Sequence, residues 1–129
     1  MPHALILLAH GSRDPRWRAP FEQLSATLAV RSATPLRLAF MELSEPSLES
    51  TAAELENAGI TQADVLPLFF AAGRHLREDV PAQLEALRRT NPHIRLNLLA
   101  PVGDHPAFVD ALANIIETQA TVNKGKNAS

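Results

Sequence analysis

Four apolar stretches of strand length alternate with segments of helical periodicity along this 129-residue chain. They read ALILLA (residues 4–9), LRLAFM (36–41), VLPLFF (65–70) and IRLNLLA (94–100). Strands that alternate with helices are typical of βαβ units, whose strands lie parallel in one sheet. Each stretch is apolar nearly throughout, as in strands covered by helices on both faces. We therefore predict an α/β fold in which helices flank a four-stranded parallel sheet in the order βαβαβαβα.

Capping signals place the helices between these stretches. The first is expected after Asp14-Pro15, the second from Ser44-Glu45-Pro46 to Gly59, the third over Asp79 to Arg89, and the last from Asp104-His105-Pro106. Apolar residues at helical spacing predict the inward face of the first helix (Phe21, Leu24 and Leu28) and mark one side of the last (Phe108, Leu112, Ile115 and Ile116). We expect one domain over residues 1–118 and a polar, disordered tail over residues 119–129.

The composition limits the possible functions. The chain has no cysteine, so a bound metal must rest on nitrogen and oxygen ligands. No apolar stretch approaches the roughly 20 residues that cross a bilayer, and we expect a soluble, cytoplasmic protein with no membrane contact. A net charge of −2 and few aromatic residues argue against a nucleic-acid partner. A narrow sheet leaves two edges to protect, which favours a homodimer.

Four polar residues directly follow the strand-like stretches or the loops that extend them: His10, Glu42, His75 and His105. The carboxyl ends of parallel strands share one rim, where such sheets bind ligands. Imidazole and carboxylate can bind a divalent transition metal. The loops around His10 and His75 also carry arginines, which favours a site for a small polyanion. The sequence therefore predicts metal chemistry at this rim.

Several other residues are interpreted as structural. We expect His105 to be part of a helix cap, and His3 and His93 to lie at the opposite pole of the sheet. Trp17 could stack against a ligand from the first loop, but we favour the interpretation that it is an anchor that packs this loop. Three further arginines are interpreted as solvated loop charges: Arg16, Arg18 and Arg77.

Four motifs give the chain a specific resemblance. They are LLAHGSRDP (7–15), AFMELSEPSLES (39–50), PLFFAAGRHLREDVP (67–81) and APVGDHPAF (100–108). Together they resemble, in order, the short-form sirohydrochlorin cobaltochelatases, class II chelatases that insert Co²⁺ or Fe²⁺ into a reduced tetrapyrrole. The resemblance implies a chelatase-like fold that corresponds to one flavodoxin-like half. It also implies a lyase activity that serves cobalamin or sirohaem synthesis.

The same resemblance implies the roles of individual residues. His10 and His75 match the family's metal-binding, proton-accepting histidines, and Glu42 is expected to assist metal entry or proton uptake. Ser12, Arg13 and Arg74 are expected to bind the carboxylate-rich macrocycle, since guanidinium pairs with carboxylate. No permanently bound cofactor is expected. The metal is a substrate, with Co²⁺ favoured over Fe²⁺ or Ni²⁺.

Two alternatives stay open from the sequence. A tetrapyrrole or metal carrier on the same scaffold would use the same residue types without turnover. A histidine phosphatase also places a histidine and glycine after its first strand, but Ala9 stands where that class has an arginine. An α/β-hydrolase is disfavoured because the chain has no Gly-x-Ser-x-Gly nucleophile turn.

Overall fold

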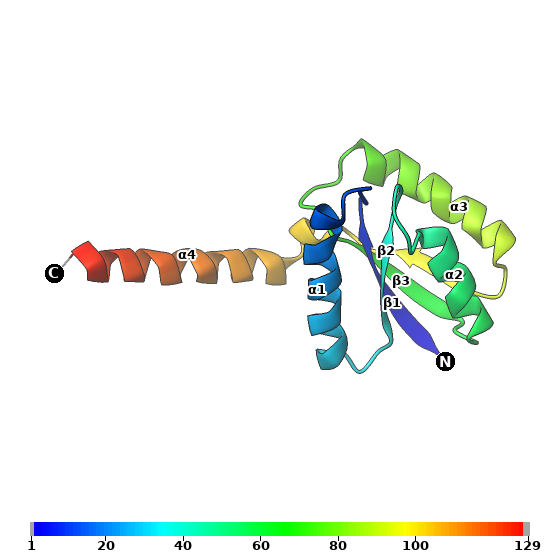
Figure 1. The fold of residues 1–129 in the computed structure, drawn as a ribbon, viewed down its shortest axis with the longest axis horizontal. Helices are drawn as coiled ribbons and strands as arrows, with labels where there is room; N and C mark the ends of the chain where they lie inside the picture. The colour runs from blue at the N-terminus through cyan, green and yellow to red at the C-terminus, as the bar shows by residue number, and fades with distance from the viewer. Residues whose placement is uncertain (1, 128–129) are drawn as a thin grey trace.

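The computed structural model describes residues 2–127, apart from the side chains of residues 75 and 122–127. Strands and helices alternate as predicted (Figure 1). The strands are β1 (His3–Ala9), β2 (Leu36–Phe40), β3 (Gln62–Pro67) and β4 (Arg95–Leu98). The α-helices are α1 (Pro15–Arg31), α2 (Leu48–Asn57), α3 (Val80–Thr90) and α4 (Pro106–Asn127). A π-helix, η1 (His75–Asp79), precedes α3, and a 3₁₀-helix, η2 (Val102–Asp104), precedes α4.

The four strands form one sheet in the order β2-β1-β3-β4, and every neighbouring pair is parallel. This confirms the predicted fold class. Because all strands run the same way, the loops that follow β1, β2, β3 and β4 gather at one rim. The four predicted rim positions therefore follow strands that end at the same pole of the sheet.

The core lies between the sheet and helices α2 and α3. Alternate residues of β1 and β3 face these helices and are buried, because successive side chains of a strand point to opposite faces. The buried cluster includes Ala4, Ile6, Leu8, Val65, Leu48, Leu55, Val80 and Leu84. Helices α2 and α3 thus each turn an apolar face into the core.

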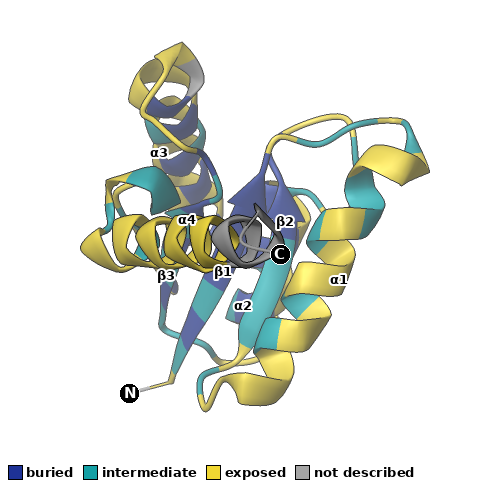
Figure 2. Cartoon of the chain, turned by 90° about the vertical axis from the view of Figure 1, so that its left-hand side faces the viewer, coloured by how far each residue is buried: buried dark blue, intermediate teal, exposed yellow. Residues whose placement is uncertain are grey.

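The other face of the sheet is covered by α1 alone, which packs mainly against β2 (Figure 2). No residue of α1 is buried. Phe21 and Leu28 of its predicted inward face are half-buried, and Leu24 is 42% exposed. Two of the three predicted inward residues are therefore partly covered and the third is exposed, because in the part of the chain that the structure describes no second helix lies beside α1.

Helix α4 extends away from the domain as a single long helix (Figure 1). Its predicted start after Asp104-His105 is confirmed, but its apolar side chains are largely exposed, with Ile115 58% and Ile116 65% exposed. The structure also continues the helix to Asn127, where a disordered tail was expected from residue 119. The polar composition of this segment reflects its exposure, and the segment contains no proline to end the helix.

The third helix begins differently from the prediction. We expected a helix from Asp79 and a loop at His75, whereas α3 runs from Val80 and follows directly on the π-helix that His75 begins. Pro81 lies in the first turn of α3, as predicted. The wide turn of a π-helix is often found at functional sites. None of the described helices is long and apolar enough to cross a membrane.

Candidate functional site at the carboxyl ends of the strands

The loop after β1 is held directly against the loop after β2. The backbone N–H of Glu42 donates to the carbonyl of His10 at 3.1 Å. Gly11 follows with φ at +101°, and a Cβ added there would lie 1.8 Å from the carbonyl oxygen of Glu42. Only glycine fits this position, because both the backbone conformation and the close approach exclude a side chain. Gly11 thereby fixes where the chain turns immediately after His10.

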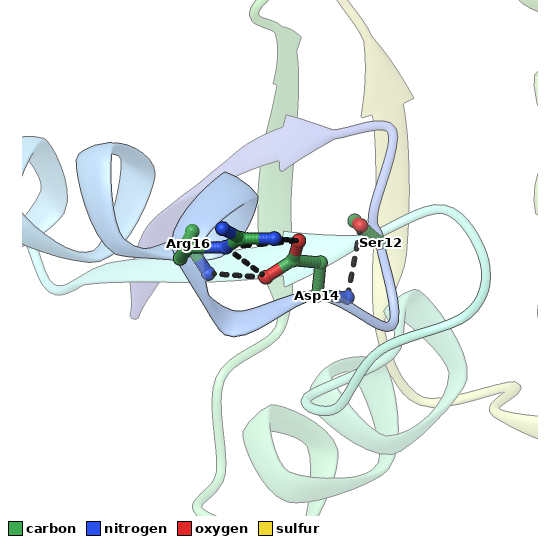
Figure 3. Close-up of polar contacts among 3 residues, drawn as sticks. All are labelled: Ser12, Asp14 and Arg16. Atoms are coloured by element: carbon green, nitrogen blue, oxygen red, sulfur yellow. Dashed lines mark hydrogen bonds and ion pairs between the residues drawn. The ribbon is translucent and has the colours of Figure 1, made fainter.

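Serine hydroxyls and a capped helix hold the rest of this loop. The N–H of Ser12 donates to the Ser44 hydroxyl at 2.8 Å, and that hydroxyl donates to the carbonyl of Ser12. The Ser12 hydroxyl accepts from the N–H of Asp14, and Asp14 caps α1 by accepting from the N–H of Arg16 (Figure 3). The Arg16 guanidinium pairs with Asp14 at 2.8 Å and, with the backbone N–H, lowers the pKa of that carboxyl.

The imidazole of His10 stacks on the ring of Phe69. The ring centroids are 4.1 Å apart and the planes differ by 15°. Phe69 is 8% exposed and belongs to the core, whereas His10 is exposed. Phe69 follows β3, so the stack joins the first and third motifs of the chain. A rigid core ring therefore sets the plane of a solvent-facing imidazole.

His10 lies at the boundary of two hollows, each of about 340 Å³. We call the first the α1 hollow; its lining comes from the β1–α1 loop, α1 and β2, namely His10, Gly11, Ser12, Trp17, Arg18, Phe21 and Phe40. Arg18 is half-buried, and its Nε atom is buried with no hydrogen-bond partner among the described residues. A buried guanidinium N–H without an acceptor is costly, so this hollow is suited to an anion.

The second, which we call the β3 hollow, is formed by the segment after β3: Leu68, Phe69, Phe70, Ala71, Gly73, Arg74 and Leu76, together with His10. Arg74 and Leu76 are the residues on either side of His75. The side chain of His75 itself lies outside the described residues. Arg74 is exposed and forms an ion pair with Glu78 at 3.1 Å, so it both lines the hollow and has an acidic neighbour.

Glu42 and Arg13 lie near these hollows without lining them. The Glu42 backbone contacts His10, but its exposed side chain lines a separate hollow formed by residues 41–49. Arg13 is exposed in the β1–α1 loop. Among the described side chains, no group of three His, Asp or Glu residues could hold a metal ion. The described side chains at this rim therefore do not by themselves make up a full set of metal ligands.

The remaining histidines are placed as predicted. His105 follows η2, and its Nε2 bonds to the carbonyl of Ala100 at 3.1 Å, which ties its loop together. His3 begins β1 and bonds to Asp64 at 2.9 Å, at the opposite end of the strands. His93 lies in the turn that leads into β4. Each of these histidines is thus separate from the two hollows.

Three residues of the site were missed or misjudged from the sequence. Arg18 was interpreted as solvated charge, yet it lines the α1 hollow. Trp17 was interpreted as a packed anchor, but it is 70% exposed and lines the same hollow. Phe69 belongs to an apolar run that gives no sign of contact with His10. For Arg18, its position one turn into a helix that starts at the rim was the available signal.

Comparison with known proteins agrees with this geometry. The CbiX family model matches residues 4–119. A Sulfolobus acidocaldarius protein named sirohydrochlorin cobaltochelatase is 30% identical, over 92% of this chain and 93% of its own length. The crystal structure of a cobalamin biosynthesis CbiX protein from Marinobacter aquaeolei has a TM-score of 0.83 and 42% identity, over 93% of this chain and 98% of its own.

A more distant structure shares the fold. It is the sirohydrochlorin chelatase SirB from Bacillus subtilis subspecies spizizenii in complex with cobalt, with a TM-score of 0.78 and 24% identity. The match covers 92% of this chain and 51% of that one, so this fold corresponds to one half of the longer protein. Family model, motifs and topology agree across nearly the whole ordered domain, and the chain therefore belongs to the CbiX family.

Proposed function

We propose that this protein is a chelatase that inserts a divalent metal into sirohydrochlorin or a related reduced tetrapyrrole. The observation that carries the proposal is the position of His10 between two hollows, one of which is lined by both neighbours of His75. Relatives named sirohydrochlorin cobaltochelatase and ferrochelatase support this substrate class. Co²⁺ is the favoured metal substrate, and Fe²⁺ or Ni²⁺ are alternatives.

The lining of the hollows suits a flat macrocycle with carboxylates at its periphery. Aromatic side chains supply apolar surface, from Trp17 and Phe21 in the α1 hollow and from Phe70 in the β3 hollow. Arg18 and Arg74 lie one in each hollow, on either side of His10. We propose that these arginines pair with carboxylates at two edges of the ring. Ser12 and Arg13, on the β1–α1 loop, extend the same carboxylate-binding surface.

Metal insertion requires that two pyrrole N–H groups lose their protons as M²⁺ takes their place. We propose that His10 and His75 bind the ion through neutral imidazole and then accept these protons, one each. Imidazole releases a metal more readily than thiolate would, which suits an ion that must be handed on. The Phe69 ring orients His10 for this transfer. Glu42 is proposed to guide metal toward the rim from the neighbouring acidic loop.

A carrier that binds the macrocycle without turnover is the second candidate, because it would use the same residue types at the same rim. The phosphoryl-transfer alternative loses support, since the family match covers the motif around His10. The domain boundary at residue 118 and a cytoplasmic location stay predictions. We propose a second copy of the chain as a further partner.

The experiment mixes the protein with sirohydrochlorin and Co²⁺ and follows the absorbance change of the macrocycle. Wild type is compared with His10→Ala and His75→Ala, and with His93→Ala as a control at the opposite pole. We expect both rim variants to lose about 100-fold or more in rate, and the control to keep wild-type activity. Binding without acceleration by wild type would establish the carrier, and full activity of His75→Ala would rule out the two-histidine mechanism.

A further inference from the structure

The 3₁₀-helix η2, which belongs to the fourth motif, lies directly against the segment that carries Phe69. The N–H of Gly103 donates to the carbonyl of Phe69 at 3.1 Å. A Cβ added at Gly103 would lie 1.7 Å from the carbonyl oxygen of Phe70 and 2.7 Å from its Cα. The two backbones can approach this closely only because residue 103 has no side chain. The fourth motif therefore reaches the rim through Gly103.

Contacts on both sides hold η2 in place. Strand β4, which precedes it, pairs with β3. Within η2, the N–H of Asp104 donates to the carbonyl of the buried Pro101 at 2.9 Å. His105 ties the following residue back to the preceding loop, because its Nε2 bonds to the carbonyl of Ala100 at 3.1 Å. These contacts give Gly103 a fixed position relative to the sheet.

Phe69 is held from two directions. On its N-terminal side, the N–H of Leu68 donates to the carbonyl of Leu8 in β1 at 2.9 Å, and on its C-terminal side its own carbonyl accepts from Gly103. The Phe69 ring is 8% exposed and stacks on the imidazole of His10, with ring centroids 4.1 Å apart. A single ring stack is a weak interaction. It can set the plane of an exposed imidazole only if the Phe69 ring is itself fixed.

We infer that Gly103 is a positioning residue, which sets the orientation of the His10 imidazole through Phe69. The inference rests on the proposed function, in which His10 accepts a pyrrole proton. A side chain at residue 103 must push the Phe69–Phe70 segment away by roughly 1.5 Å, since a carbon–oxygen contact is normally about 3.3 Å. Phe69 then leaves the stack and His10 loses its orientation. Gly103→Ala is therefore expected to slow insertion about 10-fold or more.

Nuclear magnetic resonance of histidine-labelled protein, without metal or tetrapyrrole, tests the positioning directly. Protons that lie over a stacked aromatic ring resonate upfield of their usual position, and His10→Ala identifies the His10 signals. We expect upfield His10 signals in wild type that return toward the usual position in Phe69→Leu and in Gly103→Ala. Asp104→Ala, which removes only an exposed side chain of η2, is expected to leave them unchanged. Wild-type signals at the usual position, or unchanged signals in Gly103→Ala, would overturn the inference.

His105→Ala tests the same link if Gly103→Ala does not fold, as judged by circular dichroism. This variant loses the bond to the Ala100 carbonyl and adds no side chain near Phe70. It is expected to loosen η2 and to move the His10 signals in the same direction by a smaller amount. Unchanged His10 signals in His105→Ala would then overturn the inference.

The insertion assay measures the consequence for the reaction. Because Gly103 acts through Phe69, the double variant Gly103→Ala/Phe69→Leu is expected to be no slower than the slower single variant, whereas independent effects would multiply. Asp104→Ala is expected to insert at the wild-type rate. Multiplied losses, or a wild-type rate for Gly103→Ala, would overturn the inference. Absence of insertion by wild type would instead overturn the proposed function, and the His10 signals would still decide whether Gly103 sets the imidazole.

Discussion

Substitution of Gly11 by alanine tests how closely the rim is fitted around His10. The new Cβ would lie 1.8 Å from the carbonyl oxygen of Glu42, where a carbon–oxygen contact is normally about 3.3 Å. The two loops must therefore separate by roughly 1.5 Å. This movement breaks the hydrogen bond that the N–H of Glu42 donates to the carbonyl of His10. The positive φ of +101° adds a separate cost for any residue with a Cβ.

Gly59→Ala is the matched control. Gly59 also has a positive φ, +84°, but nothing lies within 4 Å of an added Cβ. Its substitution is expected to cost about 1 kcal/mol for the backbone conformation alone. Gly11→Ala adds an overpacking cost of roughly 1–3 kcal/mol, for a total of about 3 kcal/mol. Both variants restrict the unfolded chain equally, so this contribution cancels in the comparison.

Thermal unfolding and the insertion assay measure the two consequences. At roughly 3–5 °C per kcal/mol for a chain of this size, the midpoint is expected to fall by about 10 °C for Gly11→Ala and about 4 °C for Gly59→Ala. Displacement of His10 by about 1 Å is expected to reduce the insertion rate about 100-fold, with no such loss in Gly59→Ala. Equal stability of the two variants, or full activity of Gly11→Ala, would refute the argument.

Two further predictions concern the β1–α1 region. Arg18→Met keeps an apolar stem and removes the guanidinium whose buried Nε has no partner among the described residues, so KM for the macrocycle is expected to rise about 10-fold or more. Arg16→Met loses only the exposed pair with Asp14 and is expected to leave KM unchanged. Equal KM values for the two variants would show that Arg18 is not part of the site. The hydrogen bonds from Arg16 lower the pKa of Asp14 from 3.8, so its ionised form stabilises the fold above this pH and the benefit is lost as the pH falls through the lowered value. The stability advantage of wild type over Asp14→Asn should therefore shrink below about pH 3.8, as measured by thermal unfolding across pH 2.5–7; a constant difference would contradict it.

Local patterns were sufficient to predict most of the fold. The four apolar stretches became the four parallel strands, and the proline and capping residues at Asp14-Pro15 and His105-Pro106 placed the starts of α1 and α4. These features depend on backbone preferences of neighbouring residues, which the sequence shows directly. The rim position of His10 followed from the same logic, because a residue that directly follows a parallel strand lies at the carboxyl-end rim of the sheet.

The composition of the site was less predictable, because its members are far apart along the chain. The contact between His10 and Phe69 joins residues that follow the first and third strands, and nothing in the local run around Phe69 distinguishes it from other core residues. Arg18 looks like any surface arginine on a helix until the hollow beside it is known. A π-helix starts at His75 where a loop was expected. The type of helix formed there depends on how this segment continues into α3, which local sequence does not show.

The sequence by itself determined the order of elements, the parallel sheet and the pole at which His10 lies, because these follow from hydrophobic period, caps and strand direction. Only the tertiary structure decided which side chains share a hollow with His10, how closely Gly11 brings two loops together, and where α4 goes. The spacing of the apolar residues in α4 is typical of a helix with one buried face. Such spacing shows which face of the helix is apolar, but not what packs against it. The direction of α4 is set by contacts of Gly103 and Phe108 with the segment after β3, which are interactions between distant parts of the chain.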